Sequence, residues 1–182
     1  MSAIELRQLY EQRTRVLQRH PSLAKASVQA SVKLVSTAAC EVRRADRVTR
    51  VDLPLDEGGT DSGPTPGDLM RASLGACMAM SYRSWAVRLG VDIRSVEVDV
   101  TCEFDARGQL GIAEDVAIGW ERLFLEVRIV SADSPAAVRR VVDVADRLSP
   151  MLANLSPDIA RAHALTISRP ETPTTTLTKE LP

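Results

Sequence analysis

The chain has 182 residues, a formal net charge of −1, 45% hydrophobic residues and 26% charged residues. This is the size and composition of one globular domain with short appendages. The near-neutral charge excludes a protein that coats nucleic acid, because such proteins carry a basic excess. Aromatic residues make up only 3%, which is too few for a base-stacking platform or an aromatic ligand cage.

The sequence contains three cysteines, Cys40, Cys77 and Cys102, and only two histidines. An odd number of cysteines without a Cys-x-x-Cys pair does not make a disulfide framework, and the scarcity of histidine argues against a zinc site. We therefore expect no metal or other cofactor. Residues 1–20 lack the pattern of a signal peptide, and no apolar run approaches the ~18 residues of a membrane span. These observations predict a cytoplasmic protein with free thiols and no membrane partner.

Apolar residues at helical spacing predict an amphipathic helix over 4–19, within an N-terminal extension of residues 1–24. Such a helix either packs on its own domain or dimer, or serves as a docking arm for a partner protein. Between Lys25 and Leu34 the apolar period changes to two, which predicts a strand with Val28, Ala30, Val32 and Leu34 on its core face. Two more strands are expected over 38–44 and 47–53, followed by a Gly-rich loop over 56–64.

A long helix is predicted from Thr65 to Leu89. Thr65 suits the N-cap, Pro66 the first turn and Asp68 the third position of a capping box, and Gly90 suits the C-terminal cap. Residues 72–80 carry no charge, so this helix is expected to be buried on all sides at the centre of the fold.

The second half alternates two strands, a helix and a last strand. Strands are predicted over 94–105 and about 123–129, a helix starts at Ser134-Pro135, the step Ser149-Pro150 breaks it, and 161–168 forms the last strand. Strand clusters interrupted by two helices predict an α+β fold. The domain is expected to cover 25–169 and to be followed by a flexible tail over 170–182.

Cys77 is the residue with the most chemical interest. From its spacing within an apolar helix it is either a small buried hydrophobe or a nucleophile, and the second role requires a cation from another segment. Cys40 and Cys102 are expected to be inert core thiols, and spacing suggests no partner for His20 or His163.

Residues 63–77, Gly-Pro-Thr-Pro-Gly-Asp-Leu-Met-Arg-Ala-Ser-Leu-Gly-Ala-Cys, resemble the start of the central helix in the OsmC family, which comprises osmotically inducible and organic-hydroperoxide-resistance proteins. The predicted order of elements over 25–169 is similar too. The resemblance implies antiparallel sheets around a long central helix, in an intertwined homodimer with a site at each end of the subunit interface.

The resemblance also implies roles for particular residues. Cys77 matches the thiolate that attacks a peroxide and becomes a sulfenic acid. A second cysteine in a Cys-Pro step resolves it as a disulfide, an arginine from the N-terminal strands activates the thiol, and a glutamate at the start of the helix orients that arginine.

The sequence departs from this pattern at two of the four positions. The Cys-Pro step is Ser149-Pro150, so the second thiol is missing. The glutamate position is Gly67, and Asp68 follows it as a substitute or as a helix cap. Arg50 and Arg47 are the leading candidates for the activating cation, with Arg43 and Arg44 behind them.

Two functions remain open at this point. One is a one-Cys thiol peroxidase that reduces an apolar organic hydroperoxide at Cys77, with Arg50 or Arg47 as the cation and an external dithiol as reductant. Its pocket is expected to be lined by Leu74, Met78, Met80 and Leu155. The alternative is a non-catalytic dimer of the same fold that binds a small apolar ligand or acts in a stress response. Outside the family, a protein scaffold acting through the N-terminal helix is a third hypothesis.

Overall fold

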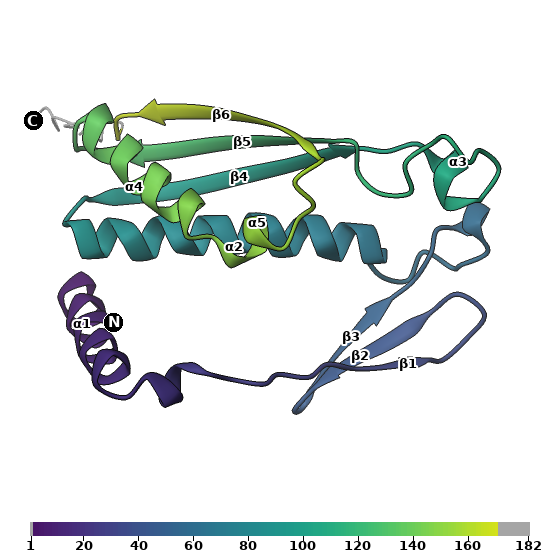
Figure 1. Cartoon of the computed structure of the whole chain (residues 1–182), viewed down its shortest axis with the longest axis horizontal. Helices are drawn as coiled ribbons and strands as arrows, with labels where there is room; N and C mark the ends of the chain where they lie inside the picture. The colour runs from purple at the N-terminus through teal and green to yellow at the C-terminus, as the bar shows by residue number, and fades with distance from the viewer. Residues whose placement is uncertain (1, 171–182) are drawn as a thin grey trace, which may run out of the picture.

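Two three-stranded sheets and one long helix form the frame of the protein in the computed structural model, which describes residues 2–170 (Figure 1). The elements follow each other as α1 (Ala3–Arg19), η1 (Pro21–Ala24), β1 (Ser31–Leu34), β2 (Cys40–Arg44), β3 (Arg47–Val51), η2 (Leu55–Glu57), α2 (Pro66–Leu89), β4 (Ile93–Glu103), α3 (Ala106–Gln109), β5 (Arg122–Ser131), α4 (Pro135–Arg147), α5 (Pro150–Ala153) and β6 (Ala160–Ser168). The α+β class is confirmed. The predicted tail lies outside the described residues from residue 171 onward.

The start and end of α2 follow from its capping residues. The Thr65 hydroxyl accepts from the Asp68 backbone N–H at 3.1 Å, and the Asp68 carboxylate accepts from the Thr65 N–H at 2.9 Å. Gly90 ends the helix in the left-handed conformation, with φ of 73°, which costs glycine little. The predicted capping box and both ends of the helix are confirmed.

The second sheet, in the order β4-β5-β6, carries the core. Its inner face packs on α2 and α4, and buried residues of all these elements form one hydrophobic cluster. One part of the expected sheet arrangement is wrong, because β6 pairs with β5 in parallel whereas β4 pairs with β5 antiparallel. The crossover through α4 and α5 returns the chain to the same end of the sheet, so the last strand runs in the same direction as β5.

The first sheet, β1-β2-β3, is antiparallel and lies apart from the second sheet (Figure 1). The strand predicted from Lys25 begins only at Ser31, because β2 turns into β3 after Arg44 and leaves the earlier residues without a neighbouring strand. The register puts Val32, Leu34 and Val42 on one face with Arg44 and Arg47. That face was expected in a core, yet Val32 is 61% exposed and Leu34 is 64% exposed.

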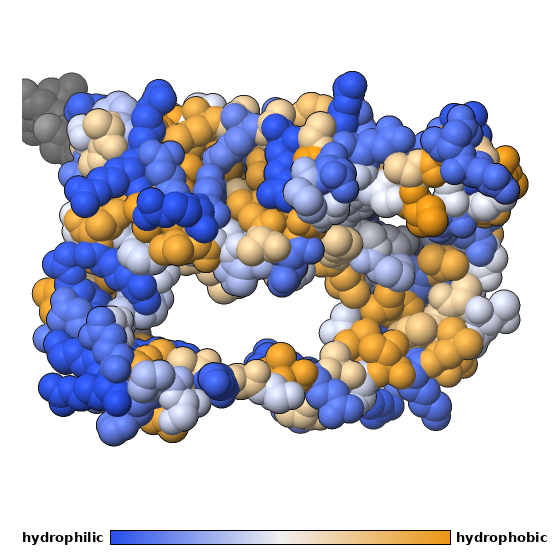
Figure 2. All heavy atoms as spheres, viewed as in Figure 1, coloured by the Kyte–Doolittle hydropathy of each residue, from blue (hydrophilic) through white to orange (hydrophobic). Residues whose placement is uncertain are grey.

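The space-filling view explains this exposure. Figure 2 shows an opening that passes through the chain, framed by α2, by α1 and the segment after it, and by the first sheet. Apolar side chains border the opening over the first sheet. No other segment among residues 2–170 covers them.

The same opening corrects the prediction that α2 is buried on all sides. Leu74, Gly75, Met78, Tyr82, Ala86 and Val87 are buried on the side that faces the second sheet. On the other side Met80 is 67% exposed, and Ser73 and Ala76 are exposed too. The apolar composition of the helix was predicted correctly, but one sheet can cover only one side of a helix.

Candidate functional site

Cys77 lies on the open side of α2, with its thiol free and half-buried. It borders a shallow groove of about 500 Å³. The groove is lined by Tyr10, Ser73, Ala76, Cys77, Met80, Ser81, Ser84, Pro150 and Met151. The thiol therefore has access to molecules that enter from the opening, which favours the nucleophile over the buried hydrophobe among the two roles left open for Cys77.

Helical geometry brings most of these residues together. Ser73, Cys77, Met80, Ser81 and Ser84 are spaced by three or four residues, so they share one side of α2. The three serines were missed by the sequence analysis, although this spacing would have identified them. Of the four residues predicted to line the pocket, only Met80 does so. Leu74 and Met78 lie on the opposite side of the helix in the core, and Leu155 borders a separate depression.

Ser149 lies beside this groove, since its neighbour Pro150 lines it. Its side chain is not free for chemistry. Ser149 is 3% exposed, and its hydroxyl accepts a hydrogen bond from the backbone N–H of Leu152 at 3.3 Å as the N-cap of α5. The position where the family resemblance implies a second cysteine thus holds a helix cap.

No arginine lines the groove among residues 2–170. Arg50 lies on β3, where its Nε donates to the Ser62 hydroxyl at 2.5 Å. Arg43 pairs with Glu41. Arg44 and Arg47 are direct cross-strand neighbours at the end of the β2-β3 hairpin, and neither takes part in an ion pair within the part of the chain that the structure describes. Both side chains are exposed, and like charges placed opposite each other on a strand pair are mildly destabilising.

Asp68 does not contact any of these arginines. Besides capping α2, its carboxylate forms an ion pair with Arg71 one turn along the same helix. Hydrogen bonds from the hydroxyl and the N–H of Thr65 hold the pKa of Asp68 below its usual value. Asp68 is thus an ionised cap that also fixes an arginine, in this case Arg71 and not Arg50.

The Gly-rich loop before α2 is organised by Asp52, which is only 2% exposed. Its carboxylate accepts from the hydroxyls of Ser62 at 2.5 Å and Thr60 at 2.6 Å, and from three backbone N–H groups. The Ser62 and Thr60 hydroxyls hold the pKa of Asp52 well below its usual range. Gly59 has no room for a side chain here, because a Cβ atom would lie 1.9 Å from the Leu53 carbonyl oxygen.

We expect the Asp52→Asn variant to unfold at a lower temperature than the wild type at pH 7, because an amide offers fewer acceptors to the same donors. The depressed pKa also fixes the sign of the pH dependence. Stabilisation by Asp52 is complete above the unfolded-state pKa of ~3.9 and is lost as the pH falls toward the folded-state value. Thermal unfolding of both proteins should be measured between pH 7 and pH 3. The difference between their unfolding temperatures should become smaller as the pH falls. An equal difference at both ends would contradict this role.

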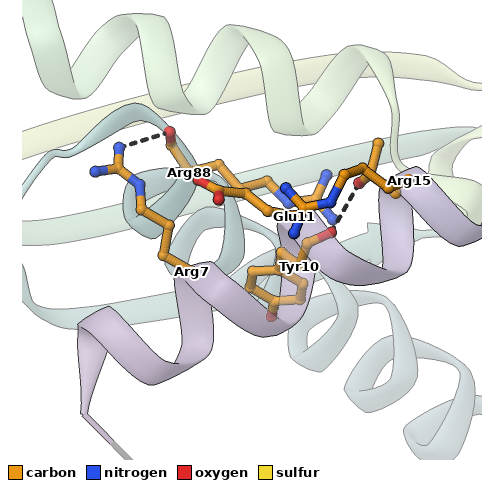
Figure 3. A pocket seen from close by; sticks show the side chains of 6 residues that line it. Arg7, Tyr10, Glu11, Arg15 and Arg88 are labelled. Carbon is orange, nitrogen blue, oxygen red and sulfur yellow. Dashed lines mark hydrogen bonds between the residues drawn. The ribbon is translucent and has the colours of Figure 1, made fainter.

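The N-terminal helix is attached to the far end of α2 by an arginine between two aromatic rings. The Arg88 guanidinium lies 4.6 Å from the ring centre of Tyr10 and 4.7 Å from that of Trp85. Arg7 donates to the Arg88 carbonyl oxygen at 3.0 Å, which satisfies one of the free carbonyls at the end of α2. Figure 3 shows Arg7 and Tyr10 of α1 and Arg88 of α2 around a pocket of about 260 Å³.

Tyr10 also lines the Cys77 groove, so the position of α1 should control access to the thiol. We expect Tyr10→Ala to increase the rate of Cys77 alkylation by iodoacetamide roughly fivefold, since a lost cation–π contact of about 1 kcal/mol shifts α1 toward release. The exposed Arg13 on the same helix supplies the control, because Arg13→Ala should leave the rate unchanged. Equal rates in the Tyr10→Ala variant and the wild type would show that α1 does not restrict the groove.

A second polar cluster lies on the core side of α2. The Tyr82 hydroxyl donates to Asp146 at 2.7 Å, and His163 Nδ1 lies 3.2 Å from the other carboxylate oxygen. Burial raises the pKa of Asp146 and that of Tyr82. His163, which had no partner in the sequence analysis, therefore has one. Tyr82 is fully buried, so the cluster joins α2, α4 and β6 and does not face the groove.

Residues 2–170 contain neither a cluster that could bind a metal ion nor a helix that could cross a membrane. No three His, Cys, Asp or Glu side chains gather where they could hold a metal ion. None of the helices described is long and apolar enough to cross a membrane.

Comparison with known proteins places this geometry in context. The sequence profile described as OsmC-like protein matches residues 59–161, more than half of the chain. This range contains α2, Cys77 and Ser149, and leaves out α1 and the first sheet. No curated protein matches the sequence significantly.

Solved structures with the same fold are distant in sequence. An OsmC-like protein from Mycoplasma pneumoniae is 16% identical with a TM-score of 0.69, over 79% of this chain and 99% of its own. An organic hydroperoxide resistance protein OsmC from Legionella pneumophila is 17% identical with a TM-score of 0.56, over 79% and 99%. An organic hydroperoxide resistance protein from Elizabethkingia anophelis is 16% identical with a TM-score of 0.59, over 80% and 99%.

Proposed function

This chain belongs to the OsmC-like protein family, and from that premise we propose that it reduces organic hydroperoxides catalytically, with Cys77 as the thiol that turns over. The observation that carries the proposal is the position of Cys77, half-exposed on an open groove in the middle of α2. A peroxidatic cysteine needs such access, because the peroxide must approach the sulfur in line with its O–O bond. The names of the Legionella and Elizabethkingia proteins agree with this chemistry.

The reaction begins with the Cys77 thiolate attacking the distal oxygen of the hydroperoxide. The S–O bond forms as the O–O bond breaks, the alkoxide takes a proton and leaves as an alcohol, and Cys77 becomes a sulfenic acid. Because Ser149 has no thiol, an external dithiol must complete the cycle. Its first thiol condenses with the sulfenic acid to a mixed disulfide and releases water, and its second thiol then releases Cys77.

The groove favours an apolar hydroperoxide over hydrogen peroxide. Met80, Met151 and Pro150 supply apolar surface beside the thiol, and Ser73, Ser81 and Ser84 supply hydroxyls that can hold the peroxide oxygens. All three cysteines of the chain are free. Free thiols and dependence on a dithiol reductant suit a reducing cytoplasm.

The cation that this reaction needs comes, in our proposal, from a second copy of the chain. A second copy would fill the opening beside α2 and cover the exposed apolar face of the first sheet (Figure 2). Arg47 and Arg44 lie on that apolar face, so they would enter the interface, whereas Arg50 lies on the opposite face and contacts Ser62. Each copy would thus place Arg47 near the Cys77 thiolate of the other.

The test is consumption of cumene hydroperoxide in the presence of dihydrolipoamide, with each oxidised cysteine located by mass spectrometry after dimedone trapping. Wild type should consume the peroxide and carry the trap on Cys77. Cys77→Ser should lose turnover, and the control Cys40→Ser should keep it. Turnover that survives Cys77→Ser, or a wild type without dimedone on Cys77, would overturn the proposal.

Two observations favour a second candidate function, that of a non-catalytic dimer that binds a small apolar ligand. The groove holds no cation within residues 2–170, and Ser149 caps a helix. In that case the groove would bind apolar molecules while Cys77 remained unoxidised by peroxide. The same trapping experiment separates the two functions.

A further inference from the structure

Cys102 has the surroundings that the sequence analysis expected for Cys77. It lies on β4 where this strand packs against α2, half-buried and in phase with Val98 and Val100. Nη1 of Arg71 lies 3.6 Å from its sulfur as a hydrogen-bond donor. The other terminal nitrogen of Arg71 is held by the Asp68 carboxylate.

This cluster holds a cation at a sulfur. A guanidinium in a fixed position can donate to the sulfur and to an oxygen that becomes bound to it, and a carboxylate that holds the guanidinium keeps it in place. The contact with Cys102 is the largest of the interactions that raise the pKa of Arg71. Arg71 therefore stays charged next to the sulfur, with its side chain 29% exposed.

The cluster lies on a different side of α2 from the Cys77 thiol. Arg71 and Gly75 line a depression of about 220 Å³ between α2 and β4, together with Ala72, Ala76, Val98, Asp99 and Val100. Ala76 borders both this depression and the Cys77 groove. Gly75 faces β4, since a Cβ atom there would lie 3.2 Å from a Val100 methyl. Cys77 lies on the other side of α2, where it lines the groove with Met80 and Ser81. A small molecule can thus approach Arg71 from the sheet side of the helix.

We propose that Cys102, Arg71 and Asp68 form a second thiol site, at which Cys102 is oxidised by a hydroperoxide in a single step, independently of Cys77 and without being recycled by the dithiol. The Cys102 thiolate attacks the distal peroxide oxygen, the S–O bond forms as the O–O bond breaks, and the alkoxide takes a proton and leaves as an alcohol. Arg71 donates to the sulfur before the reaction and to the sulfenate oxygen after it. The step needs no residue of the Cys77 groove and no second copy, so it goes beyond the proposed function.

The experiment uses the full chain with Cys77→Ser, so that only Cys40 and Cys102 can react. Cumene hydroperoxide is added in stoichiometric amount with dimedone. Mass spectrometry then identifies each cysteine that carries dimedone and measures the rate of its labelling. We expect trapping at Cys102 to be at least about tenfold faster than at Cys40, because a charge-assisted hydrogen bond to the thiolate corresponds to roughly that factor.

Arg71→Met keeps the aliphatic part of the side chain and removes the cation, and it should bring the Cys102 rate down to that of Cys40. Arg71→Lys keeps a cation and should retain part of the rate, and far-UV circular dichroism confirms that both variants fold. Equal rates at Cys102 and Cys40, or a Cys102 rate unchanged by Arg71→Met, would overturn the proposal. Wild-type trapping at Cys102 without trapping at Cys77 would support this site while refuting the proposed function.

Discussion

Replacing Arg47 by methionine should slow the oxidation of Cys77 by cumene hydroperoxide by about 10- to 100-fold. A hydrogen bond from a charged donor is worth about 1.5–3 kcal/mol, which corresponds to that range of rates. Arg47 is the first residue of β3 and lies on the face that carries Val32 and Val42, the face that a second copy is proposed to cover. The measurement is the stopped-flow rate of thiol loss at Cys77 under single-turnover conditions.

Arg50→Met is the matched control for this prediction. Arg50 lies three residues away on the same strand but on the opposite face, where it contacts Ser62. Its replacement should change the Cys77 rate by less than about twofold, while removing one hydrogen bond of the Gly-rich loop. A large loss of rate in Arg50→Met with none in Arg47→Met would identify Arg50 as the cation and show that the other face of the sheet meets the thiol.

The largest effect on assembly is expected from Val32→Asp. Burying a valine side chain is worth about 2 kcal/mol, and each dimer would contain two copies of it, so the dissociation constant should rise at least about 1,000-fold. A buried carboxylate would add a further cost. Sedimentation velocity between nanomolar and micromolar protein should show a dimer for the wild type and a monomer for Val32→Asp.

Ser31→Asp separates loss of the interface from damage to the strand. Ser31 precedes Val32 in β1 and points to the opposite face, so the new carboxylate there would face solvent and the dimer should persist. Both variants place aspartate in the same short strand and share its low strand propensity. A monomeric wild type, or a Val32→Asp variant that remains dimeric, would contradict the proposal that a second copy covers this face.

Local signals predicted the elements of this fold well. The cap residues Thr65 and Asp68, the glycine at 90 and the strict alternation over 94–103 are each determined by residues close in sequence. Their interactions form within one turn or one strand, so the sequence pattern contains them in full.

What the sequence did not predict depends on contacts between distant segments. Val28 and Val32 alternate as in a core strand, yet no part of the described chain covers them. The contacts of Tyr10 with Arg88 and of His163 with Asp146 join residues of different elements, and spacing along the sequence does not predict such contacts. The same applies to Arg71 on α2, which contacts the sulfur of Cys102 on β4.

The candidate site was predicted in part. Cys77 is accessible, and Ser149 lies next to its groove through Pro150. Asp68 was correctly given the role of a helix cap. Its ion pair with Arg71 lies within one turn of α2, whereas the contact of Arg71 with Cys102 required the packing of β4 on α2. The assignment of the activating arginine could not follow from one chain, because the first sheet makes no contact with the groove within residues 2–170.

We propose that Arg47 of one copy activates Cys77 of the other copy, and a mixed dimer tests this most directly. Cys77→Ser chains and Arg47→Met chains are co-expressed with different affinity tags, and the mixed dimer is purified through both. One of its two sites then contains an intact Cys77 together with an intact Arg47 from the other chain. The account predicts about half of the wild-type rate of hydroperoxide reduction in the mixed dimer, against nearly none in either parent dimer. A mixed dimer as inactive as its parents would contradict it.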